Sequence, residues 1–245
     1  MRKQDGTALQ PRRARDLTVA DRRRLIGRLE CAPELGEASL NRLAESSMAI
    51  DFRRRRFIYR PGDQADALFI IAQGRIKLCR IESQTGREAV IDILSEGSLF
   101  GESALYSGGG LRENCAVAYE SSRLLRIPAT AFQFCMNEDP QLQQYTLRLI
   151  GRRLENAERR LADFALNAIP ARLERMLADF SQRYGVIENG GVLIDISLPH
   201  REIASIVGST RESVTVRLNA MRREGTIDFV NRRILVKRPE ALVVS

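Results

Sequence analysis

The chain reads Leu198-Pro-His-Arg-Glu-Ile-Ala-Ser-Ile-Val-Gly-Ser-Thr-Arg-Glu-Ser-Val-Thr-Val-Arg-Leu-Asn-Ala-Met221, and this stretch predicts a helix-turn-helix. Counted from His200 as the first position, Ala204 is a small residue where the two helices cross closely. Gly208 falls in the turn, where the backbone needs a positive φ. Apolar side chains at helical spacing form a core shared by the two helices, namely Ile203, Val207, Val214, Leu218 and Met221.

The second helix of this motif exposes polar residues at its N-terminal end. Either Ser209 or Thr210 is its N-cap, and that end of a recognition helix reaches base edges in the major groove of DNA. An arginine pairs with guanine O6 and N7, a glutamate accepts from cytosine N4, and hydroxyls with helix N-terminal amides hold phosphates. We therefore predict DNA contacts by His200, Arg201, Ser209, Thr210, Arg211, Glu212, Thr215 and Arg232.

Arg232 belongs to a predicted hairpin, the wing, formed by residues 227–230 and 234–236. Two alternatives stay open in this segment. Glu212 lies three residues after Ser209, so it can act as a capping-box residue as well as or instead of a base contact. The arginines at 222 and 223 can be ordinary favourable charges at a helix C-terminus.

The overall charge favours a polyanionic partner. The chain has 245 residues, a formal net charge of +8 and a pI near 9.8, which suits nucleic acid. No apolar run approaches the roughly 18 residues of a membrane span. The basic N-terminus lacks a following hydrophobic segment, so we expect no secretory signal and a cytoplasmic protein.

The four cysteines, Cys31, Cys79, Cys115 and Cys135, are far apart, and none belongs to a CxxC motif. We expect buried reduced thiols rather than a zinc or iron–sulfur site, and no metal. The chain also lacks a nucleophile–base pairing or a phosphate loop. We therefore expect no enzyme activity.

The first half of the chain predicts a β-rich domain. Residues up to Leu17 are expected to form a flexible tail, followed by helices from Thr18 and from Glu37. Seven short strands with glycine-containing turns predict an antiparallel barrel or roll; they cover residues 56–59, 68–72, 74–81, 89–94, 98–100, 115–119 and 123–128.

Helical periodicity returns after Asp139-Pro140 as an apolar heptad seam. We expect two copies of this helix to pair in parallel, although a helix with one narrow stripe can also lie on its own domain. The dimer-interface residues would be Ile150, Leu154, Ala157, Leu161 and Phe164. Pro170 is suited to the first turn of another helix, which places a hinge near residues 167–169.

The sequence resembles the CRP/FNR family of bacterial regulators, named for the cyclic-AMP receptor protein and the fumarate–nitrate regulator. The likeness extends from about residue 20 onward. Its motifs are Tyr59-Arg-Pro-Gly-Asp63, Ile70-Ile-Ala-Gln-Gly-Arg-Ile-Lys77, Phe100-Gly-Glu-Ser-Ala-Leu105 and Gly208-Ser-Thr-Arg-Glu-Ser-Val214. After the predicted tail (1–17), the resemblance implies an α+β chain with a cyclic-nucleotide-binding-like double-stranded β-roll (18–138), a long dimerisation helix (139–166) and a winged helix-turn-helix (167–245).

The resemblance also implies how the DNA is read. Arg211 and Glu212 stand where members read a TGTGA-like half-site, arginine to G and glutamate to C. The next family arginine is replaced by Val216, and Arg217 points about 100° further round the helix, so it is not a safe substitute. We therefore expect a palindromic TGT…ACA-type site whose inner bases stay open.

The resemblance also bears on the effector. Gly101, Glu102 and Arg112 match the spacing at which cyclic-nucleotide binders hold ribose and phosphate, and Ser103 lies beside them. The adjacent Ser/Thr of the family is Glu113 here; it belongs with these four to the candidate effector-binding residues, and its carboxylate could pair with Arg112. The family's Thr-Ser pair that meets the purine corresponds to residues 157–158, Ala-Glu. Three alternatives stay open, namely a cyclic nucleotide (cAMP or cGMP), another small anion, or a structural Glu102–Arg112 salt bridge without a ligand.

These observations predict a homodimeric transcription regulator whose partners are double-stranded DNA, a second copy of itself and RNA polymerase. Haem and iron–sulfur sensing are not expected, because the sensor half has no histidine and no N-terminal cysteine cluster. The alternative function is a cyclic-nucleotide-binding regulatory protein that acts on a protein partner instead of DNA.

Overall fold

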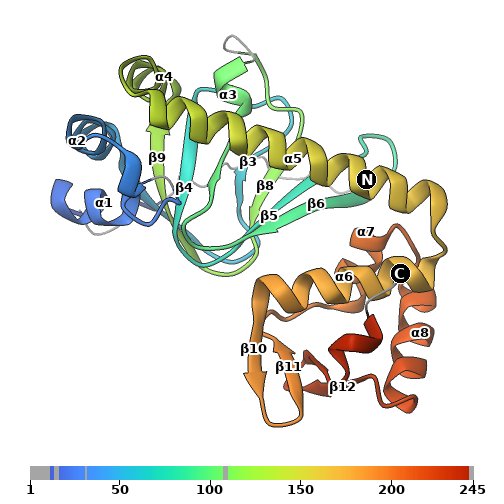
Figure 1. Cartoon of the computed structure of the whole chain (residues 1–245). Coiled ribbons are helices and arrows are strands. Elements are labelled where there is room, and N and C mark those ends of the chain that lie inside the picture. Colours follow the sequence, from blue (N-terminus) through green and yellow to red (C-terminus); the bar gives the residue numbers. More distant parts are fainter. Residues whose placement is uncertain (1–11, 14–16, 31, 107–109, 243–245) are drawn as a thin grey trace. The chain divides into compact units, whose positions relative to one another are not determined.

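The computed structural model describes residues 12–13, 17–30, 32–106 and 110–242. This part of the chain divides into two compact units (Figure 1). The first comprises the described residues up to Gly86 and Ile91–Arg152, and the second comprises Arg87–Val90 and the residues from Arg153 onward.

The first unit is a β-roll made of two antiparallel sheets, with strand orders β1-β2-β9-β4-β7 and β3-β8-β5-β6. The strands are β1 Arg12–Arg13, β2 Met48–Phe52, β3 Phe57–Tyr59, β4 Ala67–Gln73, β5 Ile76–Ile81, β6 Glu88–Leu94, β7 Leu99–Phe100, β8 Cys115–Ala118 and β9 Ser122–Pro128. Alternate side chains of both sheets form one apolar core. At its centre the rings of Phe69 and Phe100 stack with centroids 5.2 Å apart. The predicted roll is therefore confirmed.

Helices cover one sheet of the roll through a second core. They are α1 Val19–Ile26, a 3-10 turn Ala32–Glu34, α2 Glu37–Ser46, α3 Ser103–Tyr106 and α4 Ala129–Glu138. Buried Leu43 of α2, Leu68 of β4 and Phe132 of α4 belong to this core. The sequence did not predict α4 or β2, because both are short and neither carries a clear apolar period.

The expectation of a flexible tail is wrong for two residues. Arg12 and Arg13 pair with Asp51 and Ile50 of β2 as an edge strand. A two-residue strand pairs through backbone atoms alone and leaves no side-chain period in the sequence. The rest of the predicted tail up to residue 16 lies outside the described residues.

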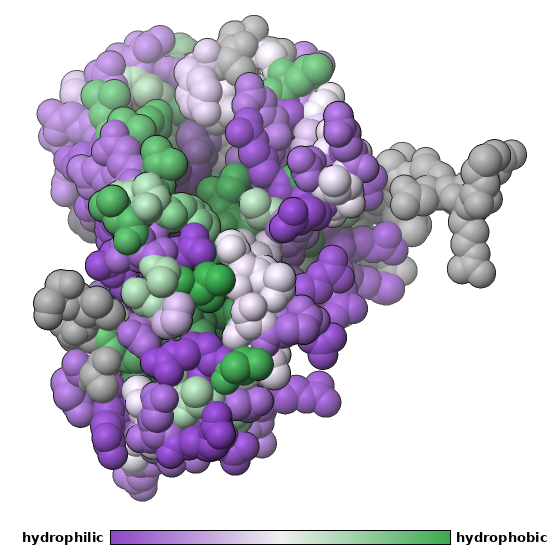
Figure 2. Space-filling view, turned by 90° about the vertical axis from the view of Figure 1, so that its right-hand side faces the viewer, coloured by the Kyte–Doolittle hydropathy of each residue, from purple (hydrophilic) through white to green (hydrophobic). Residues whose placement is uncertain are grey.

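The long helix α5, Pro140–Leu166, presents a row of exposed apolar side chains. Leu147, Leu154 and Leu161 are 65%, 59% and 70% exposed. The alternative that this seam lies on its own domain is therefore wrong for these leucines. Figure 2 shows that hydrophobic residues reach the surface in several groups among hydrophilic ones.

The second unit is a winged helix-turn-helix. Its elements are α6 Ile169–Tyr184, β10 Gly185–Glu188, β11 Gly191–Ile194, α7 His200–Val207, α8 Arg211–Arg223, β12 Ile227–Val230, β13 Arg233–Val236 and a 3-10 turn Pro239–Leu242. Pro170 stands in the first turn of α6, as predicted. The antiparallel sheet has the order β10-β11-β13-β12. The hairpin β12–β13 is the predicted wing, whereas β10 and β11 were not predicted. Among the described helices, none combines the length and apolarity required to cross a bilayer.

Candidate nucleic-acid interface and effector pocket

The turn between α7 and α8 depends on Gly208. Its φ is +65°, and as C-cap of α7 it donates its N–H to the Ala204 carbonyl oxygen. A Cβ at this position would overlap Cε1 of Phe164 and lie 3.1 Å from Cζ. Phe164 also receives the Arg172 guanidinium 4.7 Å from its ring centroid. The sequence assigned Phe164 to the α5 seam, and its packing against this turn was not predicted.

One face of α8 is fixed by the core shared with α7. The predicted core side chains are all at most 3% exposed, namely Ile203, Val207, Val214, Leu218 and Met221. The opposite face therefore points outward, and Arg211 and Glu212 are exposed on its first turn. The N–H groups of the first turn of α8 lack intrahelical acceptors, so the positive end of the helix dipole lies at this turn. The side chains of Arg211 and Glu212 project from the same turn.

The N-cap of α8 is Thr210, whose Oγ1 accepts from the Ser213 N–H at 3.2 Å. Ser213, not Glu212, thus occupies the third helical position. The alternative that Ser209 and Glu212 form a capping box is wrong, because the helix begins one residue later than that box requires.

Ser209 offers less to a phosphate than the sequence suggested. Its hydroxyl oxygen is buried and has no hydrogen-bond partner within the described ranges, and its N–H donates to the Ala204 carbonyl oxygen at 2.9 Å. By contrast, Arg201 is exposed on α7. Arg232 is exposed at the tip of the wing, with φ of +66°.

His200 and Thr215 bind one another. Thr215 Oγ1 donates to the Arg211 carbonyl oxygen at 2.7 Å and lies 2.8 Å from His200 Nδ1. Because a hydroxyl has a single hydrogen, His200 Nδ1 is the donor in that second bond. Burial, and then the positive charge of Arg211, lower the pKa of His200 below its ordinary value. This contact holds α7 against the first turns of α8.

Arg112 is the centre of the predicted effector pocket in the roll. It is 2% exposed, and its Nη1 donates to the Gly101 carbonyl oxygen and to Ser103 Oγ, each at 2.8 Å. Its Nη2 donates to the Ala67 carbonyl oxygen, and the guanidinium stacks 4.5 Å from the Tyr59 ring centroid. The roles of Ala67 and Tyr59 were not predicted, because only the folded sheet brings them to residue 112.

Gly101 allows the backbone to approach this arginine. Its φ is +86°, and a Cβ here would lie 3.2 Å from the Ala67 carbonyl oxygen and 3.4 Å from Arg112 Nη1. Burial lowers the pKa of Arg112, while Tyr59, Asp66 and Glu102 act in the opposite direction. Glu102 is thus close enough to stabilise the buried cation electrostatically.

Glu113 points away from the pocket. Its carboxylate is 81% exposed and forms an ion pair with Arg80 at 2.5 Å. The expectation that Glu113 could pair with Arg112 is wrong, because the Glu113 carboxylate lies at the surface with Arg80 while Arg112 is buried. The departure from the family motif at this position therefore does not place a carboxylate beside Arg112.

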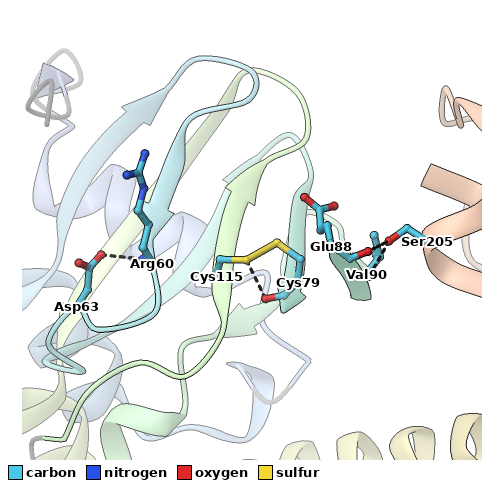
Figure 3. Close-up of a disulfide and its surroundings, with 7 residues drawn as sticks. All are labelled: Arg60, Asp63, Cys79, Glu88, Val90, Cys115 and Ser205. Carbon is cyan, nitrogen blue, oxygen red and sulfur yellow. Dashed lines mark hydrogen bonds between the residues drawn. A yellow bond between two sulfur atoms is a disulfide. The ribbon is translucent and has the colours of Figure 1, made fainter. Parts of the chain in front are cut away.

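The expectation of reduced thiols is wrong for two cysteines. Cys79 of β5 and Cys115 of β8 form a disulfide, and their Cα atoms are 5.2 Å apart (Figure 3). They are directly opposite one another in the antiparallel ladder. Cys135 is free and buried, and burial raises the pKa of its thiol. Cys31 lies outside the described residues. Across the described ranges, no three His, Cys, Asp or Glu residues gather as metal ligands.

The geometry thus defines a class of protein with a ligand-binding-type β-roll and a DNA-reading winged helix. Comparisons agree with this class. The cyclic nucleotide-binding domain model matches residues 49–139, and the Crp-like helix-turn-helix domain model matches residues 171–244.

Relatives cover most of the chain. The global nitrogen regulator of Nostoc sp. is 31% identical over 192 residues, which span 78% of this chain and 86% of that protein. The CRP-like cAMP-activated global transcriptional regulator of Mycobacterium tuberculosis is 28% identical over 200 residues, 82% of this chain and 88% of that protein. The crystal structure of a CRP/FNR-family regulator from Thermus thermophilus aligns with a TM-score of 0.65 and 26% identity, covering 79% and 95% of the two chains.

The chain therefore belongs to the CRP/FNR family. It is a DNA-binding transcription regulator with an effector-binding domain. Its relatives have this regulatory role rather than an enzymatic one. The alternative of a regulatory protein acting on a protein partner receives no support.

Proposed function

We propose that the chain acts as a homodimer that reads a palindromic TGT…ACA-like site through α8 and responds to a small anion bound at Arg112. The observation that carries this proposal is the division of α8 into two faces. Val214, Leu218 and Met221 are buried, while Arg211 and Glu212 are exposed beyond the N-cap Thr210. Arg201 and Arg232 would add phosphate contacts from the same unit.

Base contact by Arg211 can be tested with a double-mutant cycle. Arg211→Ala should weaken binding to the specific site by about 1–3 kcal/mol. Replacement of the guanine that Arg211 reads should weaken the binding of wild type by a similar amount. When the Arg211→Ala variant binds the altered site, the total loss of binding free energy should be smaller than the sum of the two single losses. Fluorescence anisotropy with labelled duplexes measures all four combinations. Fully additive losses would mean that Arg211 and that guanine do not touch.

Dimerisation is supported by the exposed seam of α5. Leu154 and Leu161 are large apolar side chains with more than half of their surface open, as expected for a surface that a second helix covers. Leu154→Asp should give a monomer in analytical ultracentrifugation. Leu166→Asp is the matched control, because Leu166 is 81% exposed but lies off the seam. A dimer that survives Leu154→Asp would contradict the proposed interface.

An anionic effector is supported by the charge balance at Arg112. Within the described residues the hydrogen-bond acceptors of its guanidinium are neutral oxygens. Glu102 and Asp66 act on it through their charge, so a bound anion would supply a charged hydrogen-bond acceptor to the buried cation. The named relatives include a cAMP-activated regulator and a nitrogen regulator, so different members of the fold answer to different signals. We place the ligand among cyclic nucleotides and other small anions held by Gly101, Glu102, Ser103 and Arg112.

Thermal-shift measurements with cAMP, cGMP, inorganic phosphate and small carboxylates test this assignment. A ligand that binds only the folded state raises stability by RT ln(1 + [L]/Kd), so weak ligands are visible at high concentration. Arg112→Lys should abolish the shift while retaining the cation. If no anion shifts the wild-type transition, the structural alternative for Arg112 holds instead. We further infer a cytoplasmic location and contact with RNA polymerase, both of which follow from the role of a transcription regulator.

A further inference from the structure

Val216 is an exposed apolar side chain in the middle of α8. It is 68% exposed, whereas its neighbours Val214 and Leu218 are completely buried. A β-branched residue has a lower helix propensity than alanine and gains nothing here from packing. Its contribution must therefore be sought outside the fold of the isolated chain.

The position of Val216 follows from helix geometry. It lies four residues after Glu212, which places it about 40° further round the helix and about 6 Å further along the axis. Glu212, Asn219 and Arg223 are exposed on the same face. All three are polar, so Val216 is the apolar member of the face that would enter the major groove.

Arg217 does not supply the missing arginine at this position. Its guanidinium donates to Glu174 of α6 at 2.6 Å and to Glu224 at 3.2 Å. This hydrogen bond to the Glu174 carboxylate, above all, raises the pKa of Arg217, and the side chain is 28% exposed. This arginine holds α6 to α8, so the exposed side chain at this level of α8 is the valine.

The chemistry of the groove decides which base pair suits a valine. Guanine presents two acceptors, O6 and N7, and would lose hydrogen bonds to water opposite an apolar side chain. Thymine alone presents an apolar group, the C5-methyl, to the major groove. Resting on the proposed function of α8, we propose that Val216 is a specificity-determining residue that selects thymine by contact with this methyl.

The proposal fixes a base that the family resemblance left open. The pair that Val216 faces lies among the inner bases, inside the TGT element, and is A·T, with the thymine methyl against the valine. An arginine at this position would favour G·C instead. The chain thus reads a more A·T-rich inner half-site than a member with arginine there.

Removal of one methyl group from the DNA tests this contact directly. A site is first obtained by selection from random duplexes, and its thymine at this position is replaced by deoxyuridine, which lacks only the methyl. Wild type should bind the deoxyuridine duplex about fourfold more weakly, the scale of one buried methyl group. Val216→Ala should bind both duplexes equally, and Val216→Arg should shift the selected pair toward G·C.

Two controls separate this inference from the proposed function. Arg211→Ala should lose overall affinity but keep the fourfold ratio, and the thermal transition of Val216→Ala should not lie below that of wild type, because the side chain is exposed and alanine is the better helix former. Selection of G·C by wild type, or equal binding of the thymine and deoxyuridine duplexes, would overturn the assignment of Val216 while Arg211 still reads its guanine. If the selection yields no duplex that wild type binds, both the assignment of Val216 and the proposed function of α8 are overturned.

Discussion

Substitution of Gly208 by alanine tests the contact between the long helix and the helix-turn-helix. Two costs follow from the structure. Alanine at φ +65° enters the left-handed region, which costs about 1–2 kcal/mol. Its Cβ overlaps the Phe164 ring, and because that ring is 46% exposed and can be displaced, the overlap costs about 1 kcal/mol, the low end for an added carbon. We expect Gly208→Ala to lower the free energy of unfolding of the second unit by roughly 2–3 kcal/mol.

Urea denaturation followed by far-UV circular dichroism measures this loss, and a second glycine isolates the steric part. Gly225 has φ of +72°, but a Cβ there meets nothing closer than 3.7 Å. Gly225→Ala should therefore show only the backbone cost. The double variant Phe164→Ala with Gly208→Ala should lose less than the sum of the single variants, because the ring no longer clashes. If Gly208→Ala costs no more than Gly225→Ala, the packing of Phe164 on the turn is refuted.

Four further outcomes are expected. Thr210→Ala should destabilise α8 by about 1 kcal/mol in urea titrations, and Glu212→Ala should cost less, because Thr210 is the N-cap and Glu212 acts through the helix dipole. Arg112→Leu should cost the roll roughly 3 kcal/mol, since it leaves the carbonyls of Ala67 and Gly101 without their donor; thermal unfolding of the roll would show no shift if these bonds were weak. His200 has a lowered pKa in the folded chain, so the unfolded chain binds more protons between that value and about 6.5, and the free energy of unfolding should fall as the pH drops through this window; His200→Gln should flatten the slope. Reduction of the Cys79–Cys115 disulfide, whose cysteines are 36 residues apart, should lower stability by about 4 kcal/mol, and a Cys135→Ser variant should show the same dependence on reductant as wild type.

The spacing of apolar residues predicted most helices and strands well, because the spacing repeats several times within each of these elements. The core of α7 and α8 was predicted from five apolar positions, and all five are buried. The helix after Pro140 and most strands of the roll were likewise predicted from their periods. Elements without a period were missed. The strands β10 and β11 have four residues each, too few for an alternation to stand out.

Side-chain partners were harder to predict, since they depend on register between segments distant in sequence. Arg112 and Glu113 are adjacent, yet the first is buried against Ala67 and the second pairs with Arg80 at the surface. Cys79 and Cys115 meet only because β5 and β8 align in one register. A motif records which residue types follow one another, but it does not record which of them is buried or which distant residue it meets.

The surroundings of Glu113 and Val216 likewise decide what these two departures from the family motif change. At Glu113 the structure turns the unusual residue outward, so the change leaves the surroundings of Arg112 intact. At Val216 the unusual residue stays on the exposed face of α8, and the neighbouring arginine is held by Glu174 instead. One departure is therefore neutral for its site, while the other alters the chemistry presented to DNA. Only the second should change what the chain recognises, and the uridine experiment measures that change in isolation from folding.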